Sequence, residues 1–219
     1  MFDQISHRYD FLNHFLSLGI DKLWRKKAVK ILRSFNPDTV LDVATGTADF
    51  AIAALDSGAK EIVGIDISEG MLNVGREKVK KYNGRIRLER GDSEHIQFND
   101  QTFDAIIVAF GVRNFEHLQK GLAEMRRVLK PGGHLIVLEF SKPSAFPVKQ
   151  VYNFYFKYIL PFWGNLLAKH KTAYSYLPES VMAFPEGEQF VAELKKAGYS
   201  IAENRPLSFG ISSIYIAQK

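Results

Sequence analysis

Residues 40–49 read VLDVATGTAD, and this stretch decides the fold. Its first four residues are mostly branched and apolar, which predicts a buried strand. The small residues Ala44, Gly46 and Ala48 then predict a tight turn in which backbone N–H groups approach a ligand closely. The same pattern also suits a buried strand with a small-residue turn that binds nothing.

A second strand pattern follows about twenty residues later and ends in an acid. Ile62–Asp66 reads IVGID, with Gly64 inside the strand and Asp66 at its end. A carboxylate at that position can accept hydrogen bonds from both hydroxyls of a ribose. The turn and the acid together predict a nucleoside site.

Two cofactors fit such a site, NAD(H) and S-adenosylmethionine. The dinucleotide fingerprint needs several glycines so that a pyrophosphate can sit against a helix N-terminus. This turn keeps only Gly46 and places Asp42 and Asp49 on either side of it. Two carboxylates repel a pyrophosphate and attract a sulfonium and an α-ammonium. The residues therefore favour S-adenosylmethionine.

The rest of the chain supplies the other elements of a doubly wound α/β sheet. A helix with Leu118, Leu122, Met125 and Val128 at core spacing is expected to end before the Lys-Pro-Gly-Gly turn of residues 130–133. Apolar and polar residues alternate in the last two expected strands, 199–206 and 213–217, which predicts an antiparallel hairpin at the sheet edge. Further strands are expected at 87–93, ending in a polar pair that could meet an adenine amine, and at 103–110, 134–140, 199–206 and 213–217.

Seven stretches resemble the class I methyltransferases and, more narrowly, the ubiquinone/menaquinone biosynthesis C-methyltransferases. They are LDVATGTAD, GIDIS, GVRNFEHLQKGLAEMRRVLKPGG, LEFSKP, YDFLNHFLSLGIDKLWRKK, YSYLPESVMAFP and LSFGISSIY. The resemblance covers nearly the whole chain. It implies a Rossmann-like, seven-stranded, mostly parallel sheet with helices on both faces and a C-terminal antiparallel hairpin.

The resemblance also implies a set of S-adenosylmethionine contacts. Two positions depart from the family: Asp21 stands where the family often has His, and Ala48 where it commonly has Gly, which is tolerable if φ there is below zero. The implied contacts are Thr47 in the turn, Asp66 on the ribose, Asp92 with Ser93 near the adenine, and Asp42 with Gly46 at the methionine end.

Length and composition bound the architecture without deciding the activity. At 219 residues and 46% hydrophobic composition, a single domain over 1–219 is expected. The chain has no cysteine, which excludes disulfides and a thiol nucleophile. There is no signal-peptide pattern and no apolar run near the ~18 residues of a spanning helix, so a soluble, cytoplasmic protein is expected.

Positive charge gathers in two segments. Residues 1–36, expected to form an N-terminal helical cap, carry seven Lys or Arg against three Asp, and residues 141–176 carry five Lys and no acid. The second segment also holds ten aromatic residues. Basic residues among aromatics suit nucleic acid or an anionic membrane surface.

Because aliphatic residues are mixed in, we favour peripheral membrane contact and a lipophilic quinol substrate, with no nucleic-acid partner. We expect 141–186 to form a helical, aromatic lid over the substrate. The alternative is an insertion whose aromatics pack on the sheet while its lysines are solvated.

Methylation of a quinol carbon requires a proton acceptor, donors for the developing oxyanion and exclusion of water. No metal is needed, and the six histidines show no ligand spacing. Arg113 and Asn114 follow a strand at the edge where α/β sheets bind ligands. We expect Arg113 to face the quinol oxygen; pairing with Glu116 or Glu139 is the alternative.

The N-terminal segment provides a second candidate cluster of Tyr9, Asp10 and Asn13. Asp10 is the expected proton acceptor, with helix capping as its alternative role.

Four functions are compatible with these residues. The first is C-methylation of a prenylated hydroquinone, above all demethylmenaquinol. The others are methylation of another hydrophobic acceptor, a non-catalytic S-adenosylmethionine-binding subunit of a membrane-bound assembly, and nucleic-acid methylation. The presence of both Asp66 and Arg113 argues against a non-catalytic subunit. The lack of an N-P-P-Y-type motif that would bind an amine argues against nucleic-acid methylation. The sequence leaves the menaquinone or ubiquinone precursor and a homo-oligomer open.

Overall fold

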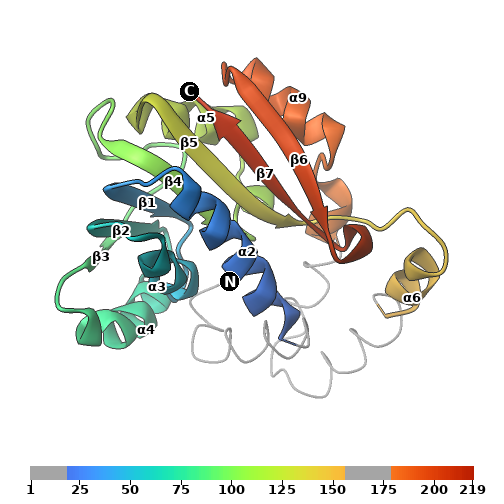
Figure 1. The fold of residues 1–219 in the computed structure, drawn as a ribbon, viewed down its shortest axis with the longest axis horizontal. Coiled ribbons are helices and arrows are strands. Elements are labelled where there is room, and N and C mark those ends of the chain that lie inside the picture. Colours follow the sequence, from blue (N-terminus) through green and yellow to red (C-terminus); the bar gives the residue numbers. More distant parts are fainter. Residues whose placement is uncertain (1–18, 156–178) are drawn as a thin grey trace.

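The computed structural model describes residues 19–155 and 179–219, which contain a seven-stranded sheet of order β3-β2-β1-β4-β5-β7-β6 (Figure 1). Strands β1 to β5 run parallel, and β7 pairs antiparallel with both β5 and β6. This confirms the predicted sheet and its terminal hairpin. The strands are β1 (Thr39–Val43), β2 (Glu61–Asp66), β3 (Ile86–Arg90), β4 (Phe103–Ala109), β5 (Leu129–Phe140), β6 (Ile201–Leu207) and β7 (Ser212–Gln218).

Helices cover both faces of the sheet because its strands alternate side chains between two cores. Val40 points to the core beneath α2 and α3, and its neighbour Leu41 points to the core beneath α5 and α9. The helices are α2 (Ile20–Ser34), α3 (Asp49–Ala54), α4 (Glu69–Val79), α5 (Leu118–Val128), α6 (Val148–Phe154) and α9 (Glu188–Lys196), with 3-10 turns η1 (Leu55–Ser57), η2 (Lys80–Tyr82), η3 (Val112–Asn114) and η5 (Ser208–Gly210).

Two strands differ from the sequence prediction. β3 ends at Arg90 rather than at residue 93, and Asp92 instead forms an isolated bridge with His95. β5 begins at Leu129, before the predicted turn at 130–133, because Leu129 already pairs with Phe103. The ladder resumes where Ala105 pairs with His134. The extra residues between these pairs form a bulge rather than a break.

The strand order reverses between β1 and β4, where α/β sheets open a crevice at the carboxyl ends of their strands. The backbone approaches closely there. A Cβ added to Gly111, after β4, would lie 2.7 Å from the Cβ of Ala44, after β1. A Cβ on Gly64 in β2 would lie 2.6 Å from Leu88. Glycine at both positions lets the turn and the neighbouring elements meet.

The described ends of the predicted lid, 141–186, are tied together. The Lys142 amide donates to the Glu186 carboxylate, and Lys142 Nζ lies 3.6 Å from Glu186 Oε1. The next amide, of Gly187, donates to the Tyr215 hydroxyl at 2.8 Å. These contacts close the base of the insertion; its function as a lid remains a prediction.

Within the predicted N-terminal cap, only the part from residue 19 onward is described. Its helix α2 packs into the core through Trp24, Ala28 and Leu32, each at most 3% exposed. This part of the segment is therefore a component of the domain core.

Candidate active site

The turn after β1 uses left-handed backbone at every second residue. Ala44, Gly46 and Ala48 have φ of 55°, 56° and 68°. The condition for a tolerable alanine at position 48, a φ below zero, is therefore not met. An alanine in this region costs about 1–2 kcal/mol relative to right-handed backbone, and the buried packing around Ala48, which is 0% exposed, holds it there.

Asp66 at the end of β2 fixes this turn. Its Oδ2 accepts a hydrogen bond from the Gly46 amide at 2.8 Å, and its Oδ1 accepts one from the Ser68 amide at 2.8 Å. A carboxylate oxygen can accept more than one hydrogen bond. Hydrogen bonds from ribose hydroxyls are therefore compatible with these two contacts.

A cavity of about 270 Å³ lies at this edge of the sheet. Its size is near the lower end of the range for small-molecule sites. Asp66 lies on its wall, and Ile67, Met71, Phe110 and Phe115 supply apolar surface for a flat ring. A smaller cavity of about 40 Å³ shares with it the walls formed by Ala44, Gly46, Ala109 and Phe110.

Asp42 lies in the smaller cavity, at the end of β1. Its side chain is buried, and its Oδ2 accepts from the Thr45 hydroxyl at 2.6 Å. Its Oδ1 has no hydrogen-bond partner of normal geometry among the described residues. Burial raises the pKa of the Asp42 carboxyl to about 7, against smaller lowering contributions from Thr45 and the Ala51 amide.

Arg25 of α2 lines the same small cavity. Its Nη1 lies 2.6 Å from Asp21 Oδ2 and 3.9 Å from Asp49 Oδ2. Its Nε is buried without a hydrogen-bond partner in the described part of the chain. Asp21 therefore holds the arginine, and Arg25 is a site residue that the sequence reasoning missed.

Thr47 also lies in the smaller cavity and is 3% exposed. Its hydroxyl accepts a hydrogen bond from Lys78 Nζ at 3.0 Å, and the same ammonium lies 2.8 Å from Asp49 Oδ1. Lys78 comes from α4, far along the chain, and no local pattern signals its role.

Asp92 and Ser93 line the larger cavity. Asp92 Oδ1 accepts from the Glu94 amide at 2.8 Å, and this bond forms a short turn that presents both residues. Glu94 in turn accepts from the His117 amide at 2.7 Å and lies 3.0 Å from His117 Nδ1. Their predicted contact with adenine remains a prediction.

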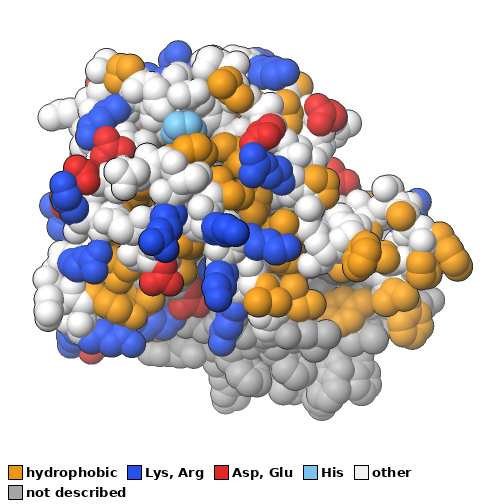
Figure 2. Space-filling view, viewed as in Figure 1, with side chains coloured by type: hydrophobic (Ala, Val, Ile, Leu, Met, Phe, Trp, Pro, Cys, Tyr) orange, Lys and Arg blue, Asp and Glu red, His pale blue; other side chains and the backbone are white. Residues whose placement is uncertain are grey.

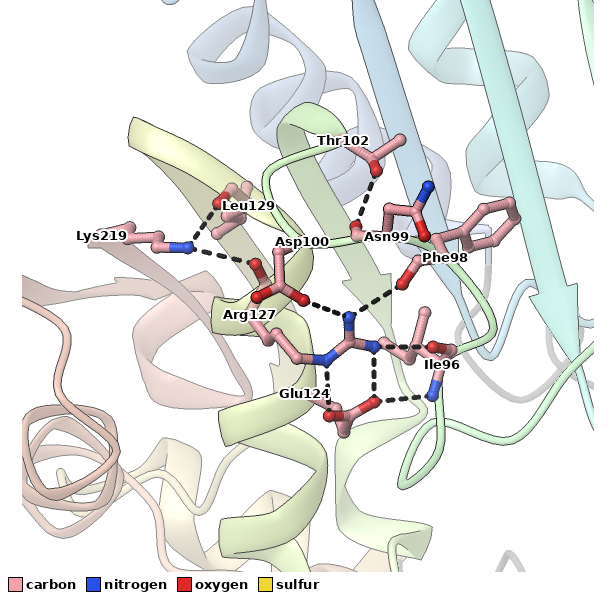
Figure 3. Close-up of polar contacts among 9 residues, drawn as sticks. All are labelled: Ile96, Phe98, Asn99, Asp100, Thr102, Glu124, Arg127, Leu129 and Lys219. Atoms are coloured by element: carbon pink, nitrogen blue, oxygen red, sulfur yellow. Dashed lines mark hydrogen bonds and ion pairs between the residues drawn. The ribbon is translucent and has the colours of Figure 1, made fainter.

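Arg127 fixes the loop that follows this turn (Figure 3). Its guanidinium donates to Glu124 and Asp100 and to the carbonyls of Ile96 and Phe98 at 2.7 to 2.9 Å. Glu124 also accepts from the Ile96 amide at 2.9 Å; the hydrogen bond from Arg127, and to a smaller extent the one from Ile96, lower the pKa of Glu124. The loop between β3 and β4 is thereby anchored to α5.

Arg113 and Asn114 lie in η3, directly after β4, but they face different surroundings. Arg113 Nη1 lies 2.8 Å from Glu139 Oε1 and also donates to the Phe110 carbonyl. The two charged side chains are 7% and 0% exposed. Asn114 lines the larger cavity. The ion pair is the alternative considered for Arg113, and a direct role at a quinol oxygen remains a prediction.

The second catalytic cluster, Tyr9, Asp10 and Asn13, lies outside the described residues. Within 19–155 and 179–219, no group of three or more His, Cys, Asp or Glu residues could hold a metal ion. Over the same ranges, no helix is both long and apolar enough to cross a membrane.

The strand order and the position of the cavity define a class I methyltransferase fold. Solved structures of this fold include an S-adenosylmethionine-dependent methyltransferase from Thermotoga maritima, described as a possible histamine N-methyltransferase (TM-score 0.69, 20% identity, 100% of this chain and 98% of that one). Another is a putative S-adenosylmethionine-dependent methyltransferase from Methanococcus maripaludis (TM-score 0.70, 20% identity, 100% and 94%).

The chain belongs to the ubiE/COQ5 methyltransferase family, whose model matches residues 1–219. It is similar to a demethylmenaquinone methyltransferase from Bacteroides fragilis, with 52% identity over 100% of this chain and 91% of the relative. It is also similar to a ubiquinone/menaquinone biosynthesis C-methyltransferase UbiE from Geobacter sulfurreducens, with 47% identity over 100% and 87%. The family resemblance read from the sequence motifs is thus confirmed.

Proposed function

We propose that this protein is an S-adenosylmethionine-dependent C-methyltransferase that converts demethylmenaquinol to menaquinol. Its membership of the ubiE/COQ5 family and the names of its relatives support the reaction. The single structural observation that carries the proposal is the pair of cavities with common lining residues, with Asp66 on the wall of one and Asp42 on the wall of the other.

The residues fit the parts of S-adenosylmethionine. Asp66 would accept the ribose hydroxyls, and Asp92 with Ser93 would meet the adenine. Asp42 Oδ1 and Arg25 Nε are buried polar atoms without partners among the described residues, and they offer an acceptor and a donor to an α-amino acid. Gly46 and Thr47 would line this methionine end.

When bound, S-adenosylmethionine would supply an electrophilic methyl group on a cationic sulfur. The protein orients the acceptor and excludes water around it. Phe110 and Phe115 would pack against the quinol ring, and Asn114 would hydrogen-bond its oxygen. Arg113, paired with Glu139, would keep the η3 turn in place and is proposed to face the quinol oxygen. Asp10 remains the proposed acceptor of the hydroxyl proton.

Peripheral membrane association would bring the enzyme to its lipophilic substrate. Figure 2 shows basic side chains over α2 and, at the right of the view, apolar side chains over α6. Phe146, Val151, Phe154 and Phe209 are 56–83% exposed. The exposed basic side chains on α2 are Lys22, Lys26, Lys27, Lys30 and Arg33. Cations beside exposed aromatics suit an anionic lipid surface.

The reaction is tested with the purified protein, methyl-labelled S-adenosylmethionine and two reduced acceptors in detergent micelles. Mass spectrometry should detect label in the product of demethylmenaquinol and less in that of a demethoxy-ubiquinol analogue. Binding of S-adenosylmethionine with no transfer to either acceptor would contradict the proposed reaction and favour another hydrophobic acceptor or a scaffold.

Membrane association is tested by sedimentation with vesicles. Binding to phosphatidylglycerol vesicles should exceed binding to phosphatidylcholine vesicles and should fall in a Lys26→Glu/Lys30→Glu variant. The matched control is Lys195→Glu/Lys196→Glu on α9, a helix that packs on the other face of the sheet. Equal loss in both variants would show only general charge attraction and would contradict the assigned surface.

A further inference from the structure

Asp42 occupies a position where its charge state must respond to a bound cation. The carboxyl is 1% exposed, and its Oδ1 lies without a hydrogen-bond partner among the described residues. The cavity that it lines is small, about 40 Å³, and shares lining residues with the larger one. A cation placed there is separated from water and interacts strongly with the carboxylate.

We propose that Asp42 gives up a proton when S-adenosylmethionine binds, so that the protein binds the cationic cofactor more tightly than the product, whose sulfur is uncharged. This inference rests on the proposed function and adds a proton to its binding equilibrium. In this proposal, Asp42 is the residue that makes the protein bind the cofactor more tightly than the product.

The direction of the proton transfer follows from burial. Without a ligand, desolvation raises the pKa of Asp42 to about 7, so a large share of the carboxyl is neutral near neutral pH. A sulfonium and an ammonium nearby favour the ionised form and lower that pKa. Binding must therefore release a proton wherever the ligand-free carboxyl still holds one.

The charges around Asp42 do not supply this compensation themselves. From β2, Asp66 raises its pKa, and from α2, Arg25 lowers it by less. Arg25 is already held at 2.6 Å by Asp21.

The other packed elements add little that could neutralise the carboxylate. From α3, Asp49 lines the same cavity as a further acid and is paired with Lys78 of α4 at 2.8 Å. β4 places the apolar Ile107 opposite Asp42 in the ladder. Within residues 19–155 and 179–219, the cations near Asp42 are already paired with other acids, Arg25 with Asp21 and Lys78 with Asp49, so a bound ligand would add the further positive charge.

Cofactor and product differ at this point by one charge. S-Adenosylmethionine carries a sulfonium, an ammonium and a carboxylate, so that its methionine end has a net charge of about +1 near neutral pH, whereas S-adenosylhomocysteine lacks the sulfonium. If Arg25 meets the carboxylate of both ligands, only the cofactor leaves an unmatched cation for Asp42. The product complex therefore keeps more of the Asp42 proton.

Isothermal titration calorimetry in buffers of different ionisation enthalpy measures this directly. At about pH 6, S-adenosylmethionine should release close to one proton per site, and S-adenosylhomocysteine clearly less. The affinity for the cofactor should rise roughly tenfold from about pH 6 to about pH 8, and more steeply than the affinity for the product. No proton release by the cofactor, or equal release by both ligands, would overturn the inference.

Two variants test whether the proton released on cofactor binding comes from Asp42. Asp42→Asn should bind the cofactor more weakly and lose the extra pH dependence. His117→Asn is the matched control because it changes a residue that bonds the cavity-lining Glu94 and leaves Asp42 in place; it should retain the proton release. Retention of the release in Asp42→Asn would overturn the assignment.

A ligand-free measurement keeps the inference testable if Asp42→Asn binds too weakly. Because folding raises the Asp42 pKa, its contribution to stability is present at low pH and is lost as pH rises through the folded-state value. The free energy of unfolding should therefore fall between about pH 5 and pH 8 by more in the parent than in Asp42→Asn. The same slope in both proteins would contradict the inference. If S-adenosylmethionine does not bind the parent at all, the proposed function itself fails; binding and methyl transfer without proton release overturn only the role of Asp42.

Discussion

Asp66 Oδ2 accepts a hydrogen bond from the Gly46 amide at 2.8 Å, so the acid that ends β2 holds the turn that follows β1. The two features of the sequence that predict a nucleoside site are therefore in direct contact. The carboxylate has two functions in this account, since it fixes the backbone of the turn and faces the larger cavity. Loss of the side chain should affect both.

Asp66→Ala is expected to abolish measurable binding of S-adenosylmethionine in calorimetry. Hydrogen bonds to a charged group are worth about 1.5–3 kcal/mol each, and two ribose contacts are lost together with the support of Gly46. Asp66→Asn keeps the size of the side chain and should retain part of the turn while binding weakly. Unchanged affinity in Asp66→Ala would show that the cavity does not bind ribose at this wall.

Gly111→Ala is expected to lower the free energy of unfolding by about 1–3 kcal/mol, as overpacking usually does. The new Cβ would lie 2.7 Å from the Ala44 Cβ and would push the turn away from β4. Chemical denaturation measures the loss, and cofactor affinity should fall with it.

The matched control for this contact is the double variant Ala44→Gly/Gly111→Ala. Removing the Ala44 methyl makes room for the new one, and glycine also suits the φ of 55° at that position. The double variant should recover most of the stability. If it is no more stable than Gly111→Ala, the close approach of the two elements is not the cause.

Arg113→Ala is expected to destabilise the protein by about 3–5 kcal/mol, because it leaves the fully buried Glu139 carboxylate without its cation. Turnover measured below the unfolding temperature should fall far more than cofactor affinity, since the η3 turn presents Asn114 to the acceptor. Equal losses of turnover and affinity would contradict the assigned position of Arg113.

The double variant Arg113→Met/Glu139→Gln separates the ion pair from catalysis. Removing both charges should restore much of the stability, because no buried charge is left unpaired. Turnover restored to the same extent would mean that Arg113 acts only through packing. Turnover that stays low in a stable protein would support its predicted role at the quinol oxygen.

Arg127→Ala is expected to reduce stability by about 2 kcal/mol, because several buried or half-buried carbonyls and carboxylates lose their donor. The affinity for S-adenosylmethionine should fall several-fold, since the loop after Asp92 and Ser93 loses its anchor. Arg126→Ala is the control, because Arg126 bonds the Gly198 carbonyl, away from this loop. Equal effects of the two variants on affinity would contradict the proposed anchoring.

The sheet and its ligand-binding edge could be predicted because they depend on local patterns. Each of these patterns spans only a few residues. They are the apolar stretches of strand length, the small-residue turn, and the alternating apolar and polar residues of the last two strands. The conformation of Ala48 could not be predicted this way, because the buried packing of the whole turn determines it. The early start of β5 at Leu129 likewise depends on pairing with a distant strand.

Much of the candidate site depends on side chains that meet across the fold. Arg25 of α2 lines the smaller cavity, and Lys78 of α4 bonds two residues of its wall, Thr47 and Asp49; neither carries a motif of its own. Arg113 was found by its place after a strand, but only the structure gives its 2.8 Å contact with Glu139. Which buried charges pair with each other cannot be predicted from local sequence patterns, because the partners are far apart in the chain.

The central claim, methylation of carbon in a quinol ring, is tested most directly by locating the transferred methyl. The protein is incubated with reduced demethylmenaquinone and S-adenosylmethionine carrying a carbon-13 methyl group, and the product is examined by NMR. A single resonance of a methyl group bonded to a ring carbon is expected, and it should be lost in Asp66→Ala. A methoxyl resonance, or label recovered only in unreacted cofactor, would contradict it.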